Sequence, residues 1–553
     1  MRASINVNDT PRLSQNPLVG CLRWMTVTFV LACFCSIPPA AAAAAGGGPQ
    51  VVIVEFHGLK NGIIADNLDR LPTFRQLIKG ASDKGSYIHL PRVLTTIPAA
   101  SVPACTAMYT GRHPRHTGVV STIWFDRTTR EIRTMIDYFQ DRINRLVAGR
   151  GIKTIFEHVA RAGGTSLSAM LMMDRGADWS LKSGMFFWGN ASTLGFLKNG
   201  RYFPDPWYID HKTVSAFLTG HLFFHTHSIN GRLQASGALP DLMVVQLLGT
   251  DIRSHFPEKS FRRADADMDT IQRHYAATVL DPEMKRMLDF FQKKGCYDQL
   301  IFILLSQQGF IKIRRHLSDS LVSEALAGRF RMSDASKVPE WAEAVVMPGA
   351  CTKEVYLKNR RTGRWLDPPR LLTDIKPAVD ALLDEPRITS ALKAMVVRQY
   401  PGERHEGIDE SGCWWRLDLE SYPASQRTED DFLTFLEPFE KKAADFALGD
   451  AIVRGLNQQY SRETTPDIKL VNQKGIYFER DTFKYGHHGS YYPEDLQVSF
   501  WIAGPGLQSV LPGRHVIEEQ ASTLDLIPMT AFLLGFPAPG GLDGRNPLAV
   551  LQD

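Results

Sequence analysis

Four short apolar runs recur along the chain, and each ends in glycine or polar residues. They are Val51–Phe56, Leu242–Leu248, Leu300–Leu305 and Val498–Ala503. Nearly continuous apolar runs of this length are typical of strands buried on both faces of a parallel sheet. Stretches with helical apolar spacing alternate with them, at Pro72–Lys79, Ala264–Lys294 and Leu524–Leu534. The pattern predicts an α/β fold, a mainly parallel sheet sandwiched between helices.

Polar residues follow three of these runs directly. They are His57–Gly58, Thr250–Asp251 and Ser306–Gly309. In open α/β sheets, ligands bind just beyond the carboxyl ends of the strands. We therefore expect the chemistry of the protein to lie among these residues.

The segment 311–484 differs from the rest, with many charges and scattered prolines. We interpret it as a cap inserted into the core. The core is then formed by residues 49–310 and 485–553, with a second insertion expected at about 151–237.

The first 48 residues have the layout of a secretory signal peptide. Three arginines precede an apolar stretch from Trp24 to Ile37, and prolines, alanines and glycines follow it. The apolar stretch is shorter than the roughly 20 residues of a membrane-spanning helix. We expect export, periplasmic or extracellular, with residues 1–48 as signal peptide and linker and no stable membrane span. A retained membrane anchor is the alternative.

The composition is that of an ordinary soluble protein and excludes few functions. The chain has 553 residues, of which 44% are hydrophobic and 22% charged, as in soluble globular proteins. The formal charge of +4 is not gathered into a basic run, so we expect no nucleic-acid partner.

Cysteines leave two alternatives open. Three of the seven fall in the presumed signal peptide, which leaves Cys105, Cys296, Cys351 and Cys413. In an oxidising compartment these could form two disulfides, and they could equally be free buried thiols.

Ser101 begins a run, Ser101–Gly111, that is typical of one short helix. Serine suits the N-cap, Pro103 the first turn and Gly111 the C-terminal stop. Taken alone, this pattern favours a structural cap. A hydroxyl at a helix N-terminus also lies where backbone amides attract a phosphate.

The spacing around this serine resembles the phosphodiesterases of the alkaline-phosphatase-like superfamily, in the type I phosphodiesterase/nucleotide pyrophosphatase branch. Their Thr or Ser nucleophile lies in a Thr-x-Pro-x-His-x-x-Leu-x-Thr-Gly pattern, followed by Pro and His-Gly. Here Ser101-Val102-Pro103 is followed, at matching spacing, by Thr110-Gly111, Pro114 and Thr117-Gly118. Thr122 falls where an Asn commonly holds a phosphoryl oxygen, so the resemblance makes it a candidate phosphate contact.

Further blocks extend the resemblance from Val51 to Asn546. They are Tyr485–Gly489, Pro493–Leu496, Ala503–Gly506, Asp525–Pro528 and Asp543–Arg545. The resemblance implies an alkaline-phosphatase-like core and a hydrolase of phosphodiester or phosphomonoester type.

One family metal site is complete in this sequence. The family uses an Asp, a His four residues later and a late His, which correspond to Asp251, His255 and His488. The i, i+4 spacing places Asp251 and His255 on one side of a helical turn. Two imidazoles and a carboxylate form a plausible catalytic zinc set with an open position, and another divalent metal is the alternative.

The second family site has lost its ligands. Where the family has Asp and an Asp-His pair, this chain has His57, Gln307 and Gln308. Amide oxygens are weak ligands for transition metals, so we expect no metal there. Ser101 then needs another base, and His57 is the candidate. The competing interpretation is that the three residues fill the old metal cavity, since no third group that would orient His57 is evident from the sequence.

A sulfatase-type site is disfavoured, because Cys105 stands where that branch requires Arg. Two functional hypotheses are therefore carried forward. The first is a one-metal hydrolase of small phosphoesters in an exported compartment, with Ser101 as nucleophile. The second is a catalytically inactive relative that binds a ligand or a partner protein. A transferase that moves a phosphoryl-linked group is a weaker third hypothesis.

Overall fold

The computed structural model describes residues 48–552, with gaps inside that range. The gaps are residues 81, 136–141, 182–195, 199–200, 204, 221–226, 350, 401–412, 423–426, 440–443, 460 and 479–482. The predicted signal peptide, up to residue 47, lies outside the described residues. Among those described, no helix is long and apolar enough to cross a membrane.

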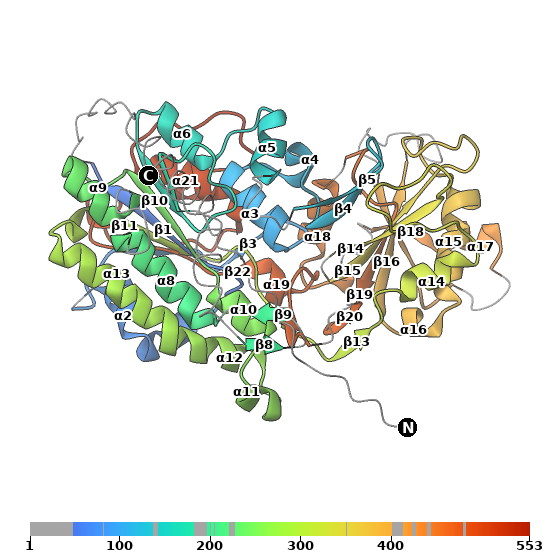
Figure 1. Cartoon of the computed structure of the whole chain (residues 1–553), viewed down its shortest axis with the longest axis horizontal. Helices are drawn as coiled ribbons and strands as arrows, with labels where there is room; N and C mark the ends of the chain where they lie inside the picture. Colours follow the sequence, from blue (N-terminus) through green and yellow to red (C-terminus); the bar gives the residue numbers. More distant parts are fainter. Residues whose placement is uncertain are drawn as a thin grey trace, which may run out of the picture. The chain divides into compact units, whose positions relative to one another are not determined.

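An eight-stranded sheet forms the centre of the fold, in the order β24-β2-β23-β11-β1-β10-β6-β7 (Figure 1). In chain order the strands are β1 (Gln50–Phe56), β2 (Tyr87–His89), β6 (Ser166–Ala169), β7 (Trp179–Leu181), β10 (Leu242–Leu247), β11 (Leu300–Leu305), β23 (Phe500–Ala503) and β24 (Arg514–Val516). β1 pairs in parallel with β10 and β11, whereas β23 is antiparallel to both of its neighbours. The predicted mainly parallel α/β sheet is confirmed.

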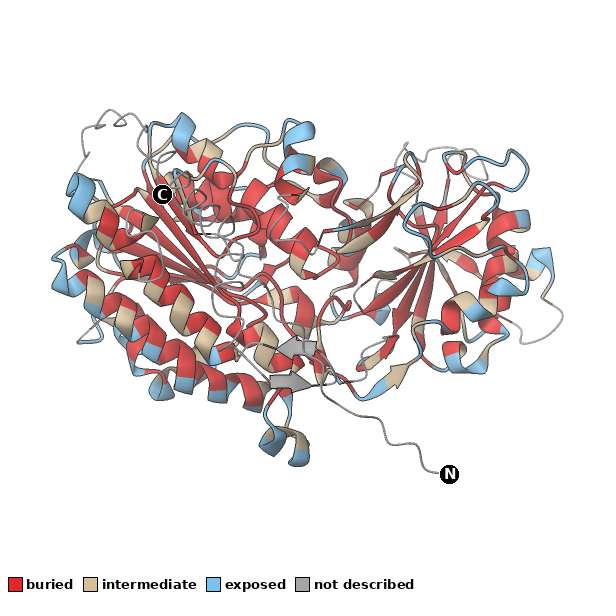
Figure 2. Cartoon of the chain, in the orientation of Figure 1, coloured by how far each residue is buried: buried red, intermediate tan, exposed pale blue. Residues whose placement is uncertain are grey.

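Helices cover both faces of this sheet because the strand β1 is apolar on both sides. Val51 and Ile53 pack in one core cluster with α3, α6 and α21. Val52 and Val54 pack in another with α2, α8 and α13. The helix bounds are α2 (Pro72–Lys79), α3 (Ser101–Thr110), α6 (Ile155–Arg161), α8 (Pro206–Thr219), α13 (Asp281–Lys293) and α21 (Leu526–Leu533). Figure 2 shows the strands buried and the outer surfaces of many of these helices exposed.

The predicted helix at Ala264–Lys294 is made of three parts. α12 (Met268–Tyr275) begins at the N-cap Asp267, a π-helical turn follows at Ala276–Leu280, and α13 completes the run. The side chain of Asp267 accepts the backbone N–H of Thr270, which explains why the helix begins there.

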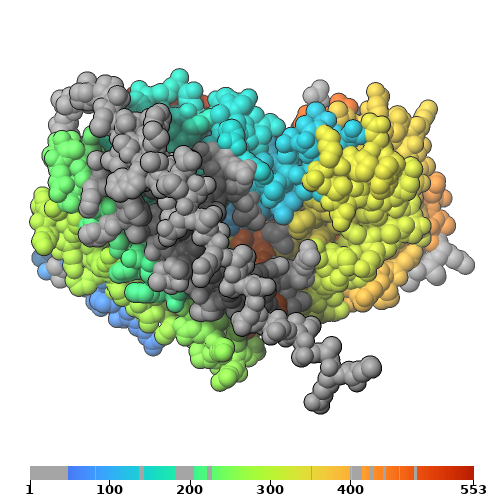
Figure 3. All heavy atoms as spheres, in the orientation of Figure 1, coloured from blue at the N-terminus to red at the C-terminus, as the bar shows by residue number. Residues whose placement is uncertain are grey.

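A second sheet lies within the segment that was predicted to be a cap. Its order is β14-β15-β19-β16-β17-β18, and all its pairs are antiparallel. The strands are β14 (Ala344–Gly349), β15 (Thr352–Leu357), β16 (Leu392–Gln399), β17 (Cys413–Leu417), β18 (Leu436–Pro438) and β19 (Ile468–Asn472). The sheet packs with α14 (Leu321–Ala327) and α15 (Lys376–Leu383) in a core cluster of its own. In Figure 3 the yellow part of this segment forms one continuous region of the face shown.

One expected boundary needs correction. β6 and β7 lie in the segment 151–237, predicted as an insertion, yet they extend the central sheet beside β10. β6 is Ser-Leu-Ser-Ala, so its sequence lacks the apolar run that marks β1, β10, β11 and β23. The remaining division of the chain into core and cap stays a prediction.

Shorter elements connect these parts. They include β3 (Val93–Leu94), α4 (Pro114–Thr117), β4 (Ile123–Asp126), β5 (Glu131–Thr134), α5 (Arg142–Gly149), β8 (Phe196–Lys198), β9 (Arg201–Phe203), α9 (Ile229–Ser236), α10 (Gly249–His255), α11 (Lys259–Arg263), β12 (Ile311–Lys312), β13 (Arg315–Leu317), α16 (Pro386–Thr389), α17 (Glu429–Thr434), α18 (Gly449–Asn457), β20 (Ile476–Phe478), β21 (Gly486–His487), α19 (Pro493–Leu496), β22 (Gln497–Val498), α20 (Leu507–Val510) and β25 (Ala521–Ser522).

Candidate active site

The strand directions bring the candidate residues to one edge of the central sheet. His57 follows β1, Asp251 follows β10 and Gln307 follows β11, and these three strands are parallel neighbours. β23 runs the opposite way, so the segment that enters it, which carries His488, approaches the same edge. Ser101 is the first residue of α3 and lies within hydrogen-bond distance of His57.

Asp251, His255 and His488 form the first cluster. One donor atom from each lies within 4.8 Å of the others. His488 Nε2 is 3.4 Å from Asp251 Oδ1, and His255 Nε2 is 3.7 Å from Asp251 Oδ2. His255 Nδ1 contacts the Gly486 carbonyl oxygen at 2.7 Å, so the ring donates there and leaves its Nε2 lone pair toward Asp251.

The electrostatics of this cluster suit a divalent metal. Burial, with a smaller contribution from nearby His487, lowers the pKa of both His255 and His488 well below the ordinary value. Both rings are therefore neutral at physiological pH, which is the form that binds metals. Burial raises the pKa of Asp251, although His57 and His487 oppose that effect. A cation held by all three groups would compensate the buried carboxylate, so the donor set fits the metal that the sequence implied.

The helix that carries Asp251 and His255 is anchored by a residue that sequence reasoning missed. Asp210 of α8 accepts the Gly249 N–H at 2.8 Å and the Tyr275 hydroxyl at 2.9 Å. A Cβ at Gly249 would lie 1.9 Å from the Tyr275 hydroxyl, so only glycine fits at the start of α10. Nothing in the spacing of the sequence marks Asp210.

The second cluster surrounds Ser101. His57 Nε2 lies 3.0 Å from Ser101 Oγ, and Gln308 Nε2 donates to the same oxygen at 3.2 Å. Gln308 also reaches Asp251 Oδ1 at 3.4 Å, which joins the two clusters. The Gln307 amide nitrogen is 2.7 Å from His57 Nδ1 and 3.1 Å from His57 Nε2. Because Gln307 and Gln308 are fully buried, these contacts are made in a water-poor environment.

A third group, which was not evident from the sequence, lies beside His57. Glu55 is fully buried, and its Oε1 lies 3.4 Å from His57 Nδ1. It accepts hydrogen bonds from the Tyr109 hydroxyl and from Gln246 Nε2, each at 2.8 Å. Burial alone would lower the pKa of His57, but Glu55 and Asp251 outweigh it and the pKa is raised. The sequence does contain a sign of this partner. Glu55 is a charged residue within an otherwise apolar strand, two residues before His57, so both side chains are expected on the same face.

The predicted capping role of Ser101 is also wrong. The N-cap of α3 is Ala100, which has no side-chain cap, and Ser101 occupies the first helical position. Its hydroxyl is therefore engaged by His57 and Gln308 instead of by the helix backbone. Gly111 ends the helix in the left-handed conformation with φ of 60°, as predicted.

Thr122 is not tied to this site. Its carbonyl oxygen accepts the Met135 N–H at 3.1 Å, next to the β4–β5 hairpin. Among the hydrogen bonds of the described residues, none joins its side chain to Ser101 or to the metal-site residues. Its contact with a phosphate stays a prediction.

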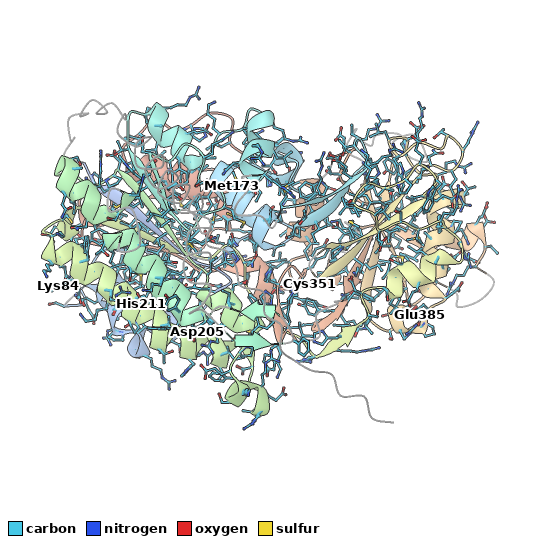
Figure 4. The ribbon with its side chains drawn as sticks, in the orientation of Figure 1. Lys84, Met173, Asp205, His211, Cys351 and Glu385 are labelled. Carbon is cyan, nitrogen blue, oxygen red and sulfur yellow. The ribbon has the colours of Figure 1, made fainter. Side chains whose placement is uncertain are left out.

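The cysteines do not form two disulfides. Cys105 and Cys296 are buried free thiols, which leaves at most one pair among the four, and the Cys413 side chain lies outside the described residues. Cys351, labelled in Figure 4, precedes β15 of the second sheet, and its thiol donates to the His488 carbonyl oxygen. The second sheet thus contacts the backbone of a candidate metal ligand.

Comparisons with known proteins bear on the family and the fold. Residues 51–368 match the sequence model of a family described as type I phosphodiesterase / nucleotide pyrophosphatase. Murine ectonucleotide pyrophosphatase / phosphodiesterase 5 has a similar solved structure, with 14% identity, a TM-score of 0.51, and coverage of 90% of this chain and 97% of that one. An inactive variant of the murine protein in complex with AMP gives the same values. The human protein of that name has 15% identity, a TM-score of 0.50, and coverage of 91% and 99%. No curated protein sequence gives a significant match. At these identities the solved structures show a shared fold.

Proposed function

The chain belongs to the type I phosphodiesterase / nucleotide pyrophosphatase family, and from that premise we propose that it hydrolyses small phosphodiesters or phosphomonoesters after export, using one metal ion. The observation that carries the proposal is the position of Ser101. Its hydroxyl lies 3.0 Å from the His57 ring, and Gln308 links it to the three-residue cluster at Asp251. A nucleophile, a base and a metal-ligand set therefore share one edge of the sheet.

Asp251, His255 and His488 would hold the metal, zinc or another divalent ion. When bound, such an ion supplies Lewis acidity that polarises a phosphoryl oxygen. The residues of the chain supply the rest. Ser101 attacks phosphorus as the phosphorus–oxygen bond to the alcohol breaks, and His57 receives the serine proton and passes it to the departing alcohol. Water then releases the phosphoryl group from Ser101. The backbone amides of the first turn of α3 offset charge on the phosphoryl oxygens.

The limit of one metal follows from the residues of the second site. His57, Gln307 and Gln308 provide one imidazole and two neutral amides where the family resemblance implies two carboxylates and an imidazole. Without those two negative charges, a second divalent ion gains too little to offset its lost hydration.

Turnover tests this proposal. Purified protein supplied with zinc or manganese is assayed on aryl phosphodiesters, aryl phosphomonoesters and aryl sulfates. Ser101→Ala should lower kcat on the preferred phosphoester by at least about 100-fold. Ser236→Ala, at the exposed end of α9, is the matched control and should leave turnover intact. Equal turnover by the wild-type and Ser101→Ala proteins would remove Ser101 from the mechanism.

The second candidate function is ligand or partner binding without turnover. The loss of the second-site carboxylates favours it, because both charges served catalysis in the pattern that this chain resembles. AMP, which the murine structure carries, is a suitable probe. Calorimetric binding of AMP, together with no turnover of any phosphoester, would support the binding function and refute the hydrolase.

Export is tested on protein expressed from the full chain. Its mature N-terminus, determined by mass spectrometry, should lie near the glycines that end the 1–48 segment. An intact N-terminus in membrane-bound protein would favour the anchor.

A further inference from the structure

Buried Glu55 and His57 and part-buried Ser101 form an ordered series at the end of β1 and the start of α3. The Glu55 carboxylate lies 3.4 Å from His57 Nδ1, and His57 Nε2 lies 3.0 Å from Ser101 Oγ. Carboxylate, imidazole and hydroxyl in this order are the three parts of an activated serine: the acid fixes the ring and the ring takes the proton. The sequence assigned His57 and Ser101 to this site but gave the ring no orienting partner.

A carboxylate lies near each ring nitrogen of His57: Glu55 is 3.4 Å from Nδ1, whereas Asp251 is 3.8 Å from Nε2, beyond hydrogen-bond distance. An atom 2.7 Å from Nδ1 and 3.1 Å from Nε2 cannot lie in line with either nitrogen, because the ring nitrogens point in different directions. The Gln307 amide therefore packs over the ring face. Gln246 Nε2 lies 3.2 Å from Nδ1 and donates to Glu55 at 2.8 Å; an amide nitrogen only donates, so it cannot accept a proton from the ring. Glu55 is therefore the group beside Nδ1 that can accept a proton from the ring, and with the proton on Nδ1 the Nε2 lone pair faces Ser101.

The contacts of Ser101 fit this proton arrangement. Its oxygen accepts a hydrogen bond from Gln308 Nε2 at 3.2 Å, which leaves its own proton free to point at His57. The same amide remains in place as a donor when charge builds on the serine oxygen.

The environment of Glu55 is unusual for a structural residue. No lysine or arginine pairs with it in the described part of the chain, and its ion-pair neighbour is His57. Its other partners are the neutral groups of Tyr109 and Gln246. A fully buried carboxylate is costly without compensating charge, and the imidazolium that forms on proton transfer provides that charge.

We propose that Glu55, His57 and Ser101 act as an acid–base–nucleophile set that replaces the second metal ion and lets Ser101 react with phosphoryl or phosphonyl electrophiles without any metal. Ser101 is the nucleophile, His57 the base, and Glu55 a positioning residue that acts through His57. This inference rests on the proposed function only for the identity of the nucleophile.

A fluorophosphonate probe isolates this step. The Ser101 oxygen forms a bond to phosphorus, the phosphorus–fluorine bond breaks, fluoride leaves, and the serine proton passes to His57 Nε2. No metal, oxidant or further reactant is needed. Mature protein treated with a chelator is incubated with the probe, and the adduct is measured by intact mass and located by peptide mapping.

The expected result is a single adduct on Ser101 in metal-free protein. Ser101→Ala should give none, His57→Ala should label at least about 100-fold more slowly, and Glu55→Gln at least about tenfold more slowly. Added imidazole should restore part of the His57→Ala rate. Glu283→Gln is the matched control, because Glu283 is also a buried glutamate beside a histidine, 2.9 Å from Nδ1 of His211 (labelled in Figure 4). The Glu283→Gln protein should be labelled at Ser101 at the wild-type rate.

A double variant distinguishes a role of Glu55 in positioning His57 from a general disturbance of the site. If Glu55 acts through His57, adding Glu55→Gln to His57→Ala should slow labelling no further. A further tenfold loss in the double variant, or an unchanged rate in folded Glu55→Gln, would overturn the role of Glu55. If Glu55→Gln does not fold, proton NMR of metal-free wild-type protein gives the second measurement. An Nδ1 proton bonded to Glu55 should give a far-downfield histidine signal, and its absence would refute the set.

The outcomes distinguish this inference from the proposed function. No labelling of Ser101, together with phosphoester turnover by metal-loaded protein, would refute the metal-independent set and leave the hydrolase standing. Labelling that depends on Glu55 without phosphoester turnover would support the set and refute the hydrolase.

Discussion

Replacing Asp210 by asparagine should make the stability of the protein less dependent on pH. Asp210 is fully buried, and its two oxygens accept the Gly249 N–H and the Tyr275 hydroxyl. Burial raises the pKa of its carboxyl group to about 7, although both hydrogen bonds favour the charged form. Asparagine keeps an oxygen for Gly249, and its amide can donate to the Tyr275 oxygen, so it imitates the protonated acid.

The magnitude follows from the two pKa values of Asp210. In the unfolded chain the group ionises near 3.8, and in the folded protein near 7. Because the pKa of Asp210 is higher in the folded protein than in the unfolded chain, the contribution of Asp210 to stability is fully present below pH 3.8. That contribution is lost as pH rises through 7. Each unit of difference between the two pKa values corresponds to about 1.4 kcal/mol of unfolding free energy. Between pH 5 and pH 8 the wild-type protein should therefore lose about 2.5 kcal/mol more unfolding free energy than Asp210→Asn.

Denaturant unfolding followed by tryptophan fluorescence at pH 5 and pH 8 measures this difference. Asp289→Asn, an exposed aspartate paired with Lys285 on α13, is the control and should keep the wild-type pH dependence. The same loss of stability in wild type and Asp210→Asn would show that Asp210 is already ionised in the folded protein at pH 5, and the reasoning would fail.

Three further predictions concern the site. Metal analysis should find about one transition-metal ion per chain, lost in Asp251→Asn, and two ions at full occupancy would contradict the assignment of the second site. Restoring carboxylates and imidazole with His57→Asp, Gln307→Asp and Gln308→His together should raise the metal content toward two, and an unchanged content would show that more than these ligands was lost. A Cβ at Gly309 would lie 1.8 Å from a backbone carbonyl oxygen, so Gly309→Ala should destabilise the protein by about 3 kcal/mol in thermal or denaturant unfolding, and a neutral effect would mean that the loop moves freely.

The core strands could be predicted because burial on both faces leaves continuous apolar runs. β1, β10 and β11 are buried along their whole length. β6 escaped prediction because two of its four residues are serines, although all four are buried. The direction of β23 could not be read from its run either, since an apolar pattern is the same in both directions. Its pairing with β11 and with β2 shows that it is antiparallel.

The candidate site was predictable where motif spacing survives and obscure where single residues act. Asp251, His255 and His488 come together as the spaced blocks implied. Glu55 and Asp210 stand outside every motif, and their importance comes from what the fold packs around them. A charged residue within a buried strand is a signal of its own, because burial of an unpaired carboxylate is costly.

The long separation between β11 and β23 also has a consequence for folding. Leu305 and Phe500 are paired in the central sheet, yet residues 306–499 lie between them in the chain. Closing so long a loop costs conformational entropy before any contact rewards it, which slows folding. The second sheet has its own core, so it can form first and shorten the effective loop. We therefore expect His488, which lies within this long segment, to join Asp251 late in folding.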